Sequence, residues 1–292
     1  MGKSSKDKRD IYYRKAKEVG YRARSAFKLL QIDEEFNLFE NVNKVVDLCA
    51  APGSWSQVLA NKLYPQQFKE ENNEKPRIIA VDLQEMTPIP GVHCLVGDIT
   101  SSATAEAIIH YFDDDMADLV VSDGAPDVTG LHDIDEYMQA QLLLAALNIT
   151  THILKPQGTF VAKIFRGRDI SLLYSQMRCF FEEVTVAKPK SSRNSSIESF
   201  IVCRKYSPPE GYVPSMSASL LDYKYGKDVP LIGPSSVIVP FVACGDITNG
   251  YDADKSYPLQ LTEGEEYVYH DPVQPPIHPN YFSFQQRQKE SK

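Results

Sequence analysis

The sequence lacks any apolar run that could cross a membrane, and it lacks paired cysteines. A membrane-spanning helix needs about 20 consecutive apolar residues, and no run in the 292-residue chain approaches that length. The charged N-terminus has no apolar core of the kind found in secretion signals. The five cysteines form no CxxC pair and no metal-ligand spacing. These absences predict a cytoplasmic protein with buried thiols, no membrane association and no metal site.

Negative charge dominates the chain, but its first 28 residues are basic. The net charge is -8, whereas residues 1–28 carry ten Lys or Arg and three acids, which gives +7 there and leaves -15 for the remainder. Such a local excess of cations can contact phosphates even on an acidic protein. A solvated helix would carry the same charges. Charge alone therefore leaves both interpretations of this basic arm open.

Short β-type runs alternate with helical patterns through the first two thirds of the chain. Apolar runs begin at Lys44, Arg77, Val92, Asp118 and Gly158, and further strands are expected near 183–187 and 197–205. Helical spacing is found at 7–18, 25–36, 55–63, 103–112, 135–154 and 170–181. This alternation predicts an α/β fold with a largely parallel sheet covered on both faces.

The composition changes after Tyr206. Eleven of the 19 prolines lie in residues 207–292, and clear periodicity largely stops there. The apolar run SVIVPFVAC at 236–244 is nevertheless of a kind that packs on something, either its own domain or a partner. We therefore divide the chain into a main domain at 1–206, with basic helices at 1–40, and a Pro-rich, acidic extension at 207–292.

The loop after the first strand, DLCAAPGSW at 47–55, consists mostly of small residues. Its Ala-Ala-Pro-Gly run, ending at Gly53, lets the backbone approach a ligand closely before a helix begins at Trp55. The loop has neither GxGxxG nor GK[ST], which argues against a dinucleotide and against a phosphate-cradling nucleotide site. A ligand without a pyrophosphate is favoured.

Two acids follow the next two strands. Asp82 could accept hydrogen bonds from both ribose hydroxyls of an adenosine, and Asp98 could accept one from the adenine amino group. Either acid alone is more often a cap or turn residue. Their joint placement beside the small-residue loop predicts a nucleoside site.

A lysine and an acid end the two strands that follow. Asp123 closes the fourth strand in SDGAPD, and Lys163 lies near the end of the fifth in AKIFRG. The two should emerge side by side above the carboxyl edge of the sheet. A solvated ion pair would explain them without chemistry, and Glu198 could be an ordinary acid that opens an edge strand.

The strings DLCAAPGSW, SDGAPD, AKIFRG and YRARSAFKL resemble the FtsJ-type RNA ribose 2′-O-methyltransferases, most closely their eukaryotic cytoplasmic tRNA anticodon-loop branch. The resemblance covers residues 1–206, and VPFVACGD and DPVQPP in the extension are similar to the tRNA branch too. It implies a Rossmann-like methyltransferase sheet of seven strands, mostly parallel with one antiparallel strand.

The resemblance also implies the site residues. The family's catalytic Lys-Asp-Lys-Glu tetrad falls on Lys28, Asp123, Lys163 and Glu198. The cofactor S-adenosylmethionine would be bound by Gly53, Trp55, Asp82, Asp98 and Asp123.

Methyl transfer to a ribose 2′-oxygen is an in-line displacement that must also remove one proton. Lys163 is the candidate base, but a free lysine has a pKa of about 10.4, so burial or a second cation such as Lys28 must neutralise it first. Asp123 and Glu198 instead favour charged lysines. The sequence leaves open which effect is larger.

The implied substrate is tRNA, methylated at the first anticodon nucleotide and at the loop nucleotide two before it. Loop cations expected to share the active face and contact phosphates are Arg166, Arg168, Lys188, Lys190 and Arg193. The resemblance further implies one of two auxiliary subunits, a WD-repeat protein or a large armadillo-like, THADA-type protein. The acidic extension suits the docking of such a partner better than it suits RNA.

Four other functions compete with this hypothesis. A 2′-O-methyltransferase of ribosomal RNA or of the messenger cap would share the tetrad. A catalytically silent RNA-binding scaffold would not need intact motifs. A nicotinamide-dependent dehydrogenase would need GxGxxG, and covalent base methylation would need a cysteine that SDGAPD lacks.

Overall fold

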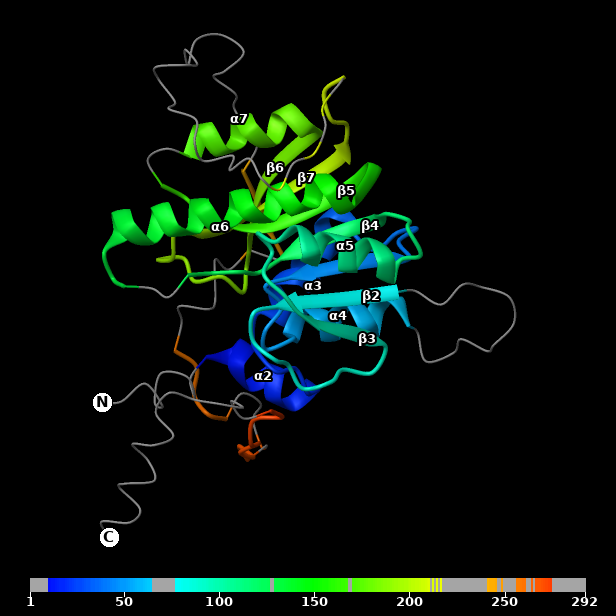
Figure 1. Ribbon diagram of the computed structural model, residues 1–292. Helices are drawn as coiled ribbons and strands as arrows, with labels where there is room; N and C mark the ends of the chain where they lie inside the picture. The colour runs from blue at the N-terminus through cyan, green and yellow to red at the C-terminus, as the bar shows by residue number, and fades with distance from the viewer. Residues whose placement is uncertain are drawn as a thin grey trace, which may run out of the picture.

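A computed structural model of the chain describes residues 10–64, 77–126, 129–167, 170–210, 241–245, 256–260 and 266–274, together with residues 212, 214, 216, 248 and 264. An eight-stranded sheet in the order β3-β2-β1-β4-β5-β7-β6-β8 runs through it (Figure 1). The strands are β1 Lys44–Leu48, β2 Arg77–Asp82, β3 Val92–Val96, β4 Ala117–Ser122, β5 Leu154–Phe165, β6 Phe181–Pro189, β7 Glu198–Tyr206 and β8 Phe241–Cys244.

One strand runs against the others. β7 pairs antiparallel with both β5 and β6, whereas the remaining neighbours pair in parallel. The predicted mostly parallel sheet with one antiparallel strand is therefore confirmed. In β1 and β4 nearly every side chain is buried, as expected for central strands that are covered on both faces.

Helices cover both faces of the sheet. They are α2 Ile11–Val19, α3 Ala26–Phe36, α4 Ser54–Leu63, α5 Ser102–Tyr111, α6 His132–Ile153 and α7 Ile170–Phe180. One apolar core joins α5, α6 and α7 to the sheet, and a second joins α2, α3 and α4 to its other face. Figure 1 shows α5 and α6 in front of the sheet, with α3 and α4 behind it. The layers leave the carboxyl ends of the parallel strands open to a ligand.

The predicted number of strands, seven, is wrong, because the extension contributes an eighth. Strand β8 pairs in parallel with β6, from Val186 opposite Phe241 to Pro189 opposite Cys244. Its apolar run was expected to pack on something, and an unpaired edge of β6 offers the backbone donors and acceptors that such a run needs. The division at 206 and 207 stays a prediction.

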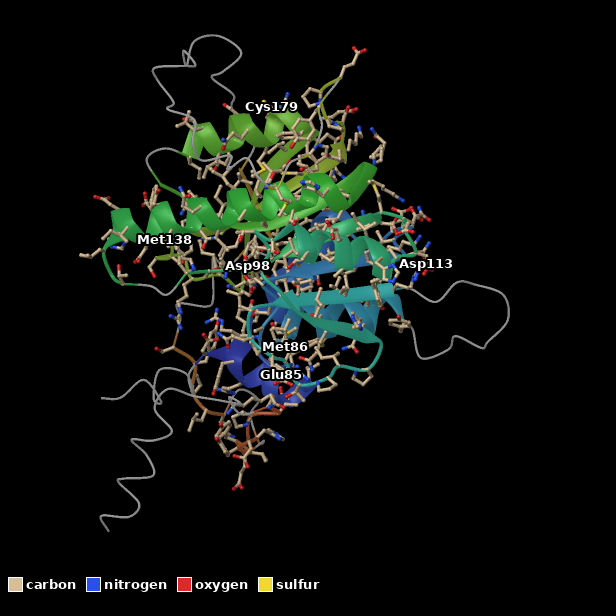
Figure 2. All side chains as sticks on the ribbon, viewed as in Figure 1. Glu85, Met86, Asp98, Asp113, Met138 and Cys179 are labelled. Atoms are coloured by element: carbon tan, nitrogen blue, oxygen red, sulfur yellow. The ribbon has the colours of Figure 1, made fainter. Side chains whose placement is uncertain are left out.

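The ends of the first helix and the exposure of three cysteines also differ from expectation. Helix α2 begins at Ile11 because the Asp10 carboxylate accepts the backbone N–H groups of Tyr12 and Tyr13, and residues 7–9 lie outside the described residues. All five cysteines are free, but only Cys203 and Cys244 are buried as predicted; Cys49 and Cys94 are half-buried, and Cys179 on α7 is exposed (Figure 2).

No helix in the part of the chain that the structure describes is both long enough and apolar enough to span a membrane.

Candidate active site

The small-residue loop connects the carboxyl end of β1 to α4, and Gly53 is its tightest point. Gly53 has φ +99° and precedes the first turn of α4. A Cβ placed there would lie 2.6 Å from Ile89 Cδ1 and 3.0 Å from Arg22 Nη1. The position therefore favours glycine for two reasons, its left-handed backbone and the lack of space. Backbone N–H groups of the first turn of α4 are left facing the loop.

Arg22 fastens this loop to the segment after β2. Its guanidinium donates hydrogen bonds to the carbonyl oxygens of Pro52 at 2.9 Å, Thr87 at 2.9 Å and Pro88 at 3.1 Å. Partial burial lowers the pKa of Arg22. No sequence pattern indicated this role, since Arg22 was one of ten cations counted in the basic arm.

Asp47 supports the loop from below. Its carboxylate is fully buried and accepts a 2.5 Å hydrogen bond from the Ser56 hydroxyl of α4. Oδ1 has no hydrogen-bond partner among the described residues. Burial raises the pKa of Asp47 to about 7, so this carboxyl group titrates near neutral pH.

Trp55, which was expected at the cofactor site, has a buried side chain. The indole is 2% exposed, donates from Nε1 to the Ser25 carbonyl at 2.9 Å, and packs against Phe200 with ring centroids 5.5 Å apart. The side chain therefore holds α3 and α4 together, and only the backbone at the start of α4 can face a ligand in the loop.

Asp82 and Asp98 lie where neighbouring strands end. Asp82 Oδ2 accepts the Ala51 N–H at 2.9 Å, which ties the loop to β2. Asp98 is exposed, and its Oδ1 accepts hydrogen bonds from the backbone and hydroxyl of Thr100. Figure 2 shows Asp98 at the edge of the sheet where β2 and β3 end, opposite the edge that carries Asp113. The structure thus brings both acids to the edge that the loop occupies.

The four residues of the expected tetrad form a continuous chain of contacts. Lys28 on α3 lies 2.7 Å from Glu198 Oε1 and donates to Oε2 at 2.8 Å. Lys163 Nζ on β5 lies 2.7 Å from Asp123 Oδ1 and 3.8 Å from Glu198 Oε2, and it donates to the Asp123 carbonyl at 2.7 Å. Glu198, the first residue of β7, therefore lies between two largely buried lysines.

The carboxylates decide the charge of Lys163. Burial by itself lowers the pKa of Lys163, but Asp123 and Glu198 outweigh it and raise the pKa above its ordinary value. Glu198 shows the converse: burial opposes ionisation, yet Lys28 and Lys163 lower its pKa to about 2. Lys163 and Glu198 are therefore both charged at neutral pH, which answers the question about Lys163 that the sequence left open.

The cations expected to contact phosphates are placed in different environments. Lys188 is 2% exposed and donates to backbone carbonyls, so the prediction that it contacts RNA is wrong. Arg166 is exposed, Lys190 and Arg193 are half-buried, and Arg168 lies outside the described residues. In the basic arm, Arg22, Arg24 and Lys28 all bind groups within the protein.

Replacement of Gly53 should weaken ligand binding at the loop more than it weakens the fold. Gly20, at φ +90° and ψ 20°, has nearly the backbone of Gly53, but a Cβ placed on it would meet nothing within 4 Å. Both Gly53→Ala and Gly20→Ala should therefore lose about 1–3 kcal/mol through backbone strain. Only Gly53→Ala should also displace Ile89 and Arg22, and so lower the affinity for S-adenosylmethionine, the cofactor that the resemblance implies. Calorimetry measures this affinity, and equal affinities in the two variants would contradict this role of Gly53.

The protein combines an open, mostly parallel sheet with a small-residue loop after β1, acids at the next strand ends and a buried series of contacts between Lys, Glu, Lys and Asp side chains. This combination defines a Rossmann-like methyltransferase. The profile of the FtsJ-like methyltransferase family matches residues 21–206. The chain belongs to this family.

Relatives whose names state an activity match most of this chain. It is 63% identical to the human tRNA (cytidine(32)/guanosine(34)-2′-O)-methyltransferase, over 96% of this chain and 83% of that protein. It is 56% identical to the Schizosaccharomyces pombe protein of the same description, over 96% of this chain and 95% of that protein. A crystal structure described as a ribosomal RNA methyltransferase of Plasmodium falciparum shares the fold, with a TM-score of 0.56 and 24% identity over 65% of this chain and 100% of that one.

Proposed function

We propose that this protein is a tRNA 2′-O-ribose methyltransferase that transfers a methyl group from S-adenosylmethionine to anticodon-loop nucleotides. The observation that carries the reaction is the chain of contacts from Lys28 through Glu198 and Lys163 to Asp123, next to the small-residue loop. The substrate is supported by the human and yeast relatives, whose names give tRNA positions 32 and 34.

The residues around the loop suit an adenosine-containing cofactor. Gly53 lets Ile89 and Arg22 pack closely against the small-residue loop, which holds the loop in place beside the carboxyl ends of the strands. We assign the ribose hydroxyls to Asp82, the adenine amino group to Asp98, and the methionine portion to Asp123 and the backbone of Gly53 and Trp55. When bound, S-adenosylmethionine supplies the electrophilic methyl group.

The lysines position the acceptor nucleotide and handle its proton. The Lys163 ammonium, held by Asp123 and Glu198, can donate a hydrogen bond that fixes a ribose 2′-oxygen. To act as the base it must first release its own proton, which its raised pKa opposes in the protein alone. Lys28 and Glu198 complete the proposed tetrad with Lys163 and Asp123, and Glu198 keeps the two ammonium groups in place.

We assign the C-terminal extension, residues 207–292, to partner binding. We place the catalytic domain at 1–206 and assign the acidic, Pro-rich segment 207–292 to an auxiliary subunit, either a WD-repeat protein or a THADA-type armadillo-like protein. The protein would act on tRNA in the cytoplasm. Loss of co-purification with either subunit after replacement of residues 207–240 and 246–292, which keeps strand β8, would support this docking role, and unchanged co-purification would count against it.

The test is methylation of anticodon stem-loop RNA by the full chain with each auxiliary subunit, using a labelled methyl group. The matched control is the same RNA with a 2′-deoxynucleotide at each target position, which removes only the acceptor oxygen. Label is expected in the ribose form and not in the 2′-deoxy form. Label retained in the deoxy RNA would indicate base methylation. Ribosomal and capped RNA are assayed in parallel, and label confined to them would exclude tRNA as the substrate.

A further inference from the structure

We infer that Lys188 is a positioning residue that, together with strand β8 of the C-terminal extension, holds Glu198 between Lys28 and Lys163. This inference rests on the proposed function, because Glu198 matters only if the tetrad performs the reaction. It gives the extension a part in the active site of its own chain.

Lys188 fixes the backbone from which Glu198 projects. The residue is 2% exposed, and its ammonium donates to the carbonyl oxygens of Ser196 at 2.8 Å and Glu198 at 2.9 Å. Burying an ammonium is costly unless it is hydrogen-bonded, so these contacts hold the turn between β6 and β7 in one arrangement. The Glu198 N–H also donates to Ser196 Oγ at 3.1 Å.

The same turn holds the carboxylate itself. Ser192 Oγ donates to Glu198 Oε1 at 2.9 Å, so one oxygen is restrained while both face Lys28. The turn is anchored to α3, since the Ser191 N–H donates to Gln31 Oε1 at 2.9 Å. Lys188 thus fixes the backbone of Glu198, and Ser192 fixes its side chain.

Strand β8 supports the end of β6 from which this turn begins. In the parallel pairing, Lys188 lies opposite Ala243 and Pro189 opposite Cys244. The Lys190 N–H then donates to the Cys244 carbonyl at 2.7 Å. Cys244 is fully buried and packs in the same apolar core as Phe200, two residues after Glu198. Val186 and Ala187 therefore pair with both β7 and β8, and the last two residues of β6, Lys188 and Pro189, pair with β8.

The first experiment compares Lys188→Met with Lys62→Met in the full chain. Lys62 is 46% exposed on α4 and pairs with Asp33 at 3.5 Å, so its loss should leave turnover unchanged. A small displacement of a catalytic group can cost about 10²-fold in rate, so Lys188→Met should lower kcat by about 10- to 100-fold. Its affinity for S-adenosylmethionine should stay within about twofold, because Lys188 lies on the Glu198 side of the site.

A double-mutant cycle separates positioning from loss of fold. If Lys188 acts through Glu198, then Lys188→Met should cost much less in a Glu198→Gln background than in the wild type. In Lys188→Met alone, the pH at which Lys163 loses its proton, read from the pH–rate profile, should also fall, because a displaced Glu198 no longer raises the Lys163 pKa. Additive losses with an unchanged pH profile would overturn the inference.

Two milder variants keep the test decisive if Lys188→Met does not fold. Ser192→Ala removes the hydroxyl that restrains Glu198, and Ala243→Pro disrupts β8 opposite Lys188; both should lower kcat with unchanged cofactor affinity. Full activity in both variants would refute the inference while the proposed function stands. A wild-type protein that methylates no tRNA would instead refute the proposed function.

Discussion

Lys163→Met should lower the rate of methyl transfer by about 10³-fold or more, because it removes both the candidate base and a group that fixes the acceptor. The side chain keeps its length and loses only the ammonium, so packing around β5 should be retained. Single-turnover transfer of a labelled methyl group to anticodon stem-loop RNA measures the effect. Lys155→Met is the matched control, since Lys155 lies at the other end of β5, 45% exposed, and pairs with Asp118.

The pH dependence of the wild-type rate distinguishes the two roles of Lys163. A base must be uncharged, and the pKa of Lys163 lies above its ordinary value, so a rate that depends on a base should rise with pH above neutrality. A group that only orients the ribose must stay charged, so the rate should be flat there and fall at higher pH. Activity of Lys163→Met equal to that of Lys155→Met would contradict both roles.

Glu198→Gln should destabilise the protein by about 3–5 kcal/mol, the cost of leaving buried charges without their partner. The amide keeps the shape of the carboxylate, but Lys28 and Lys163 lose the anion between them. Chemical denaturation at neutral pH measures the loss. Glu183→Gln is the control, since Glu183 is 36% exposed and pairs with Arg204 and Lys205, so its loss should cost about 1 kcal/mol or less.

The stability difference should disappear in acid. The pKa of Glu198 is about 2 in the folded protein and ordinarily 4.5, so its ionisation stabilises the fold at all pH values above about 4.5. That contribution is lost as pH falls from about 4.5 towards 2. Denaturation curves of the wild type and Glu198→Gln should therefore converge in this range, and a constant difference would show that the charge is not the cause.

The positions of Asp82, Asp98, Asp123 and Lys163 could be predicted because each ends a recognisable strand. Parallel strands place their carboxyl ends at one edge, so residues far apart in sequence were expected together. Gly53 could be predicted for a similar local reason, since a run of small residues directly after a strand is typical of a loop that a ligand approaches closely. Lys28 and Glu198 lie on α3 and on the antiparallel β7, and only the family resemblance connected them to the others.

The roles of the basic residues could not be predicted, because a charge count does not show what each cation faces. Arg22 holds the small-residue loop, and Arg24 pairs with Asp10. Lys188 is buried behind the tetrad, although its sequence suggested a phosphate contact. In the folded protein these cations bind carbonyl and carboxylate oxygens of the chain itself.

The sequence by itself determined the order of strands and helices, the small-residue loop and the family, because these depend on local periodicity and short motifs. Only the tertiary structure decided that β8 joins the sheet and that Lys163 is charged. Strand pairing depends on which edge is left open, and a lysine's charge depends on whether nearby carboxylates outweigh burial. Both are properties of neighbours brought together by folding.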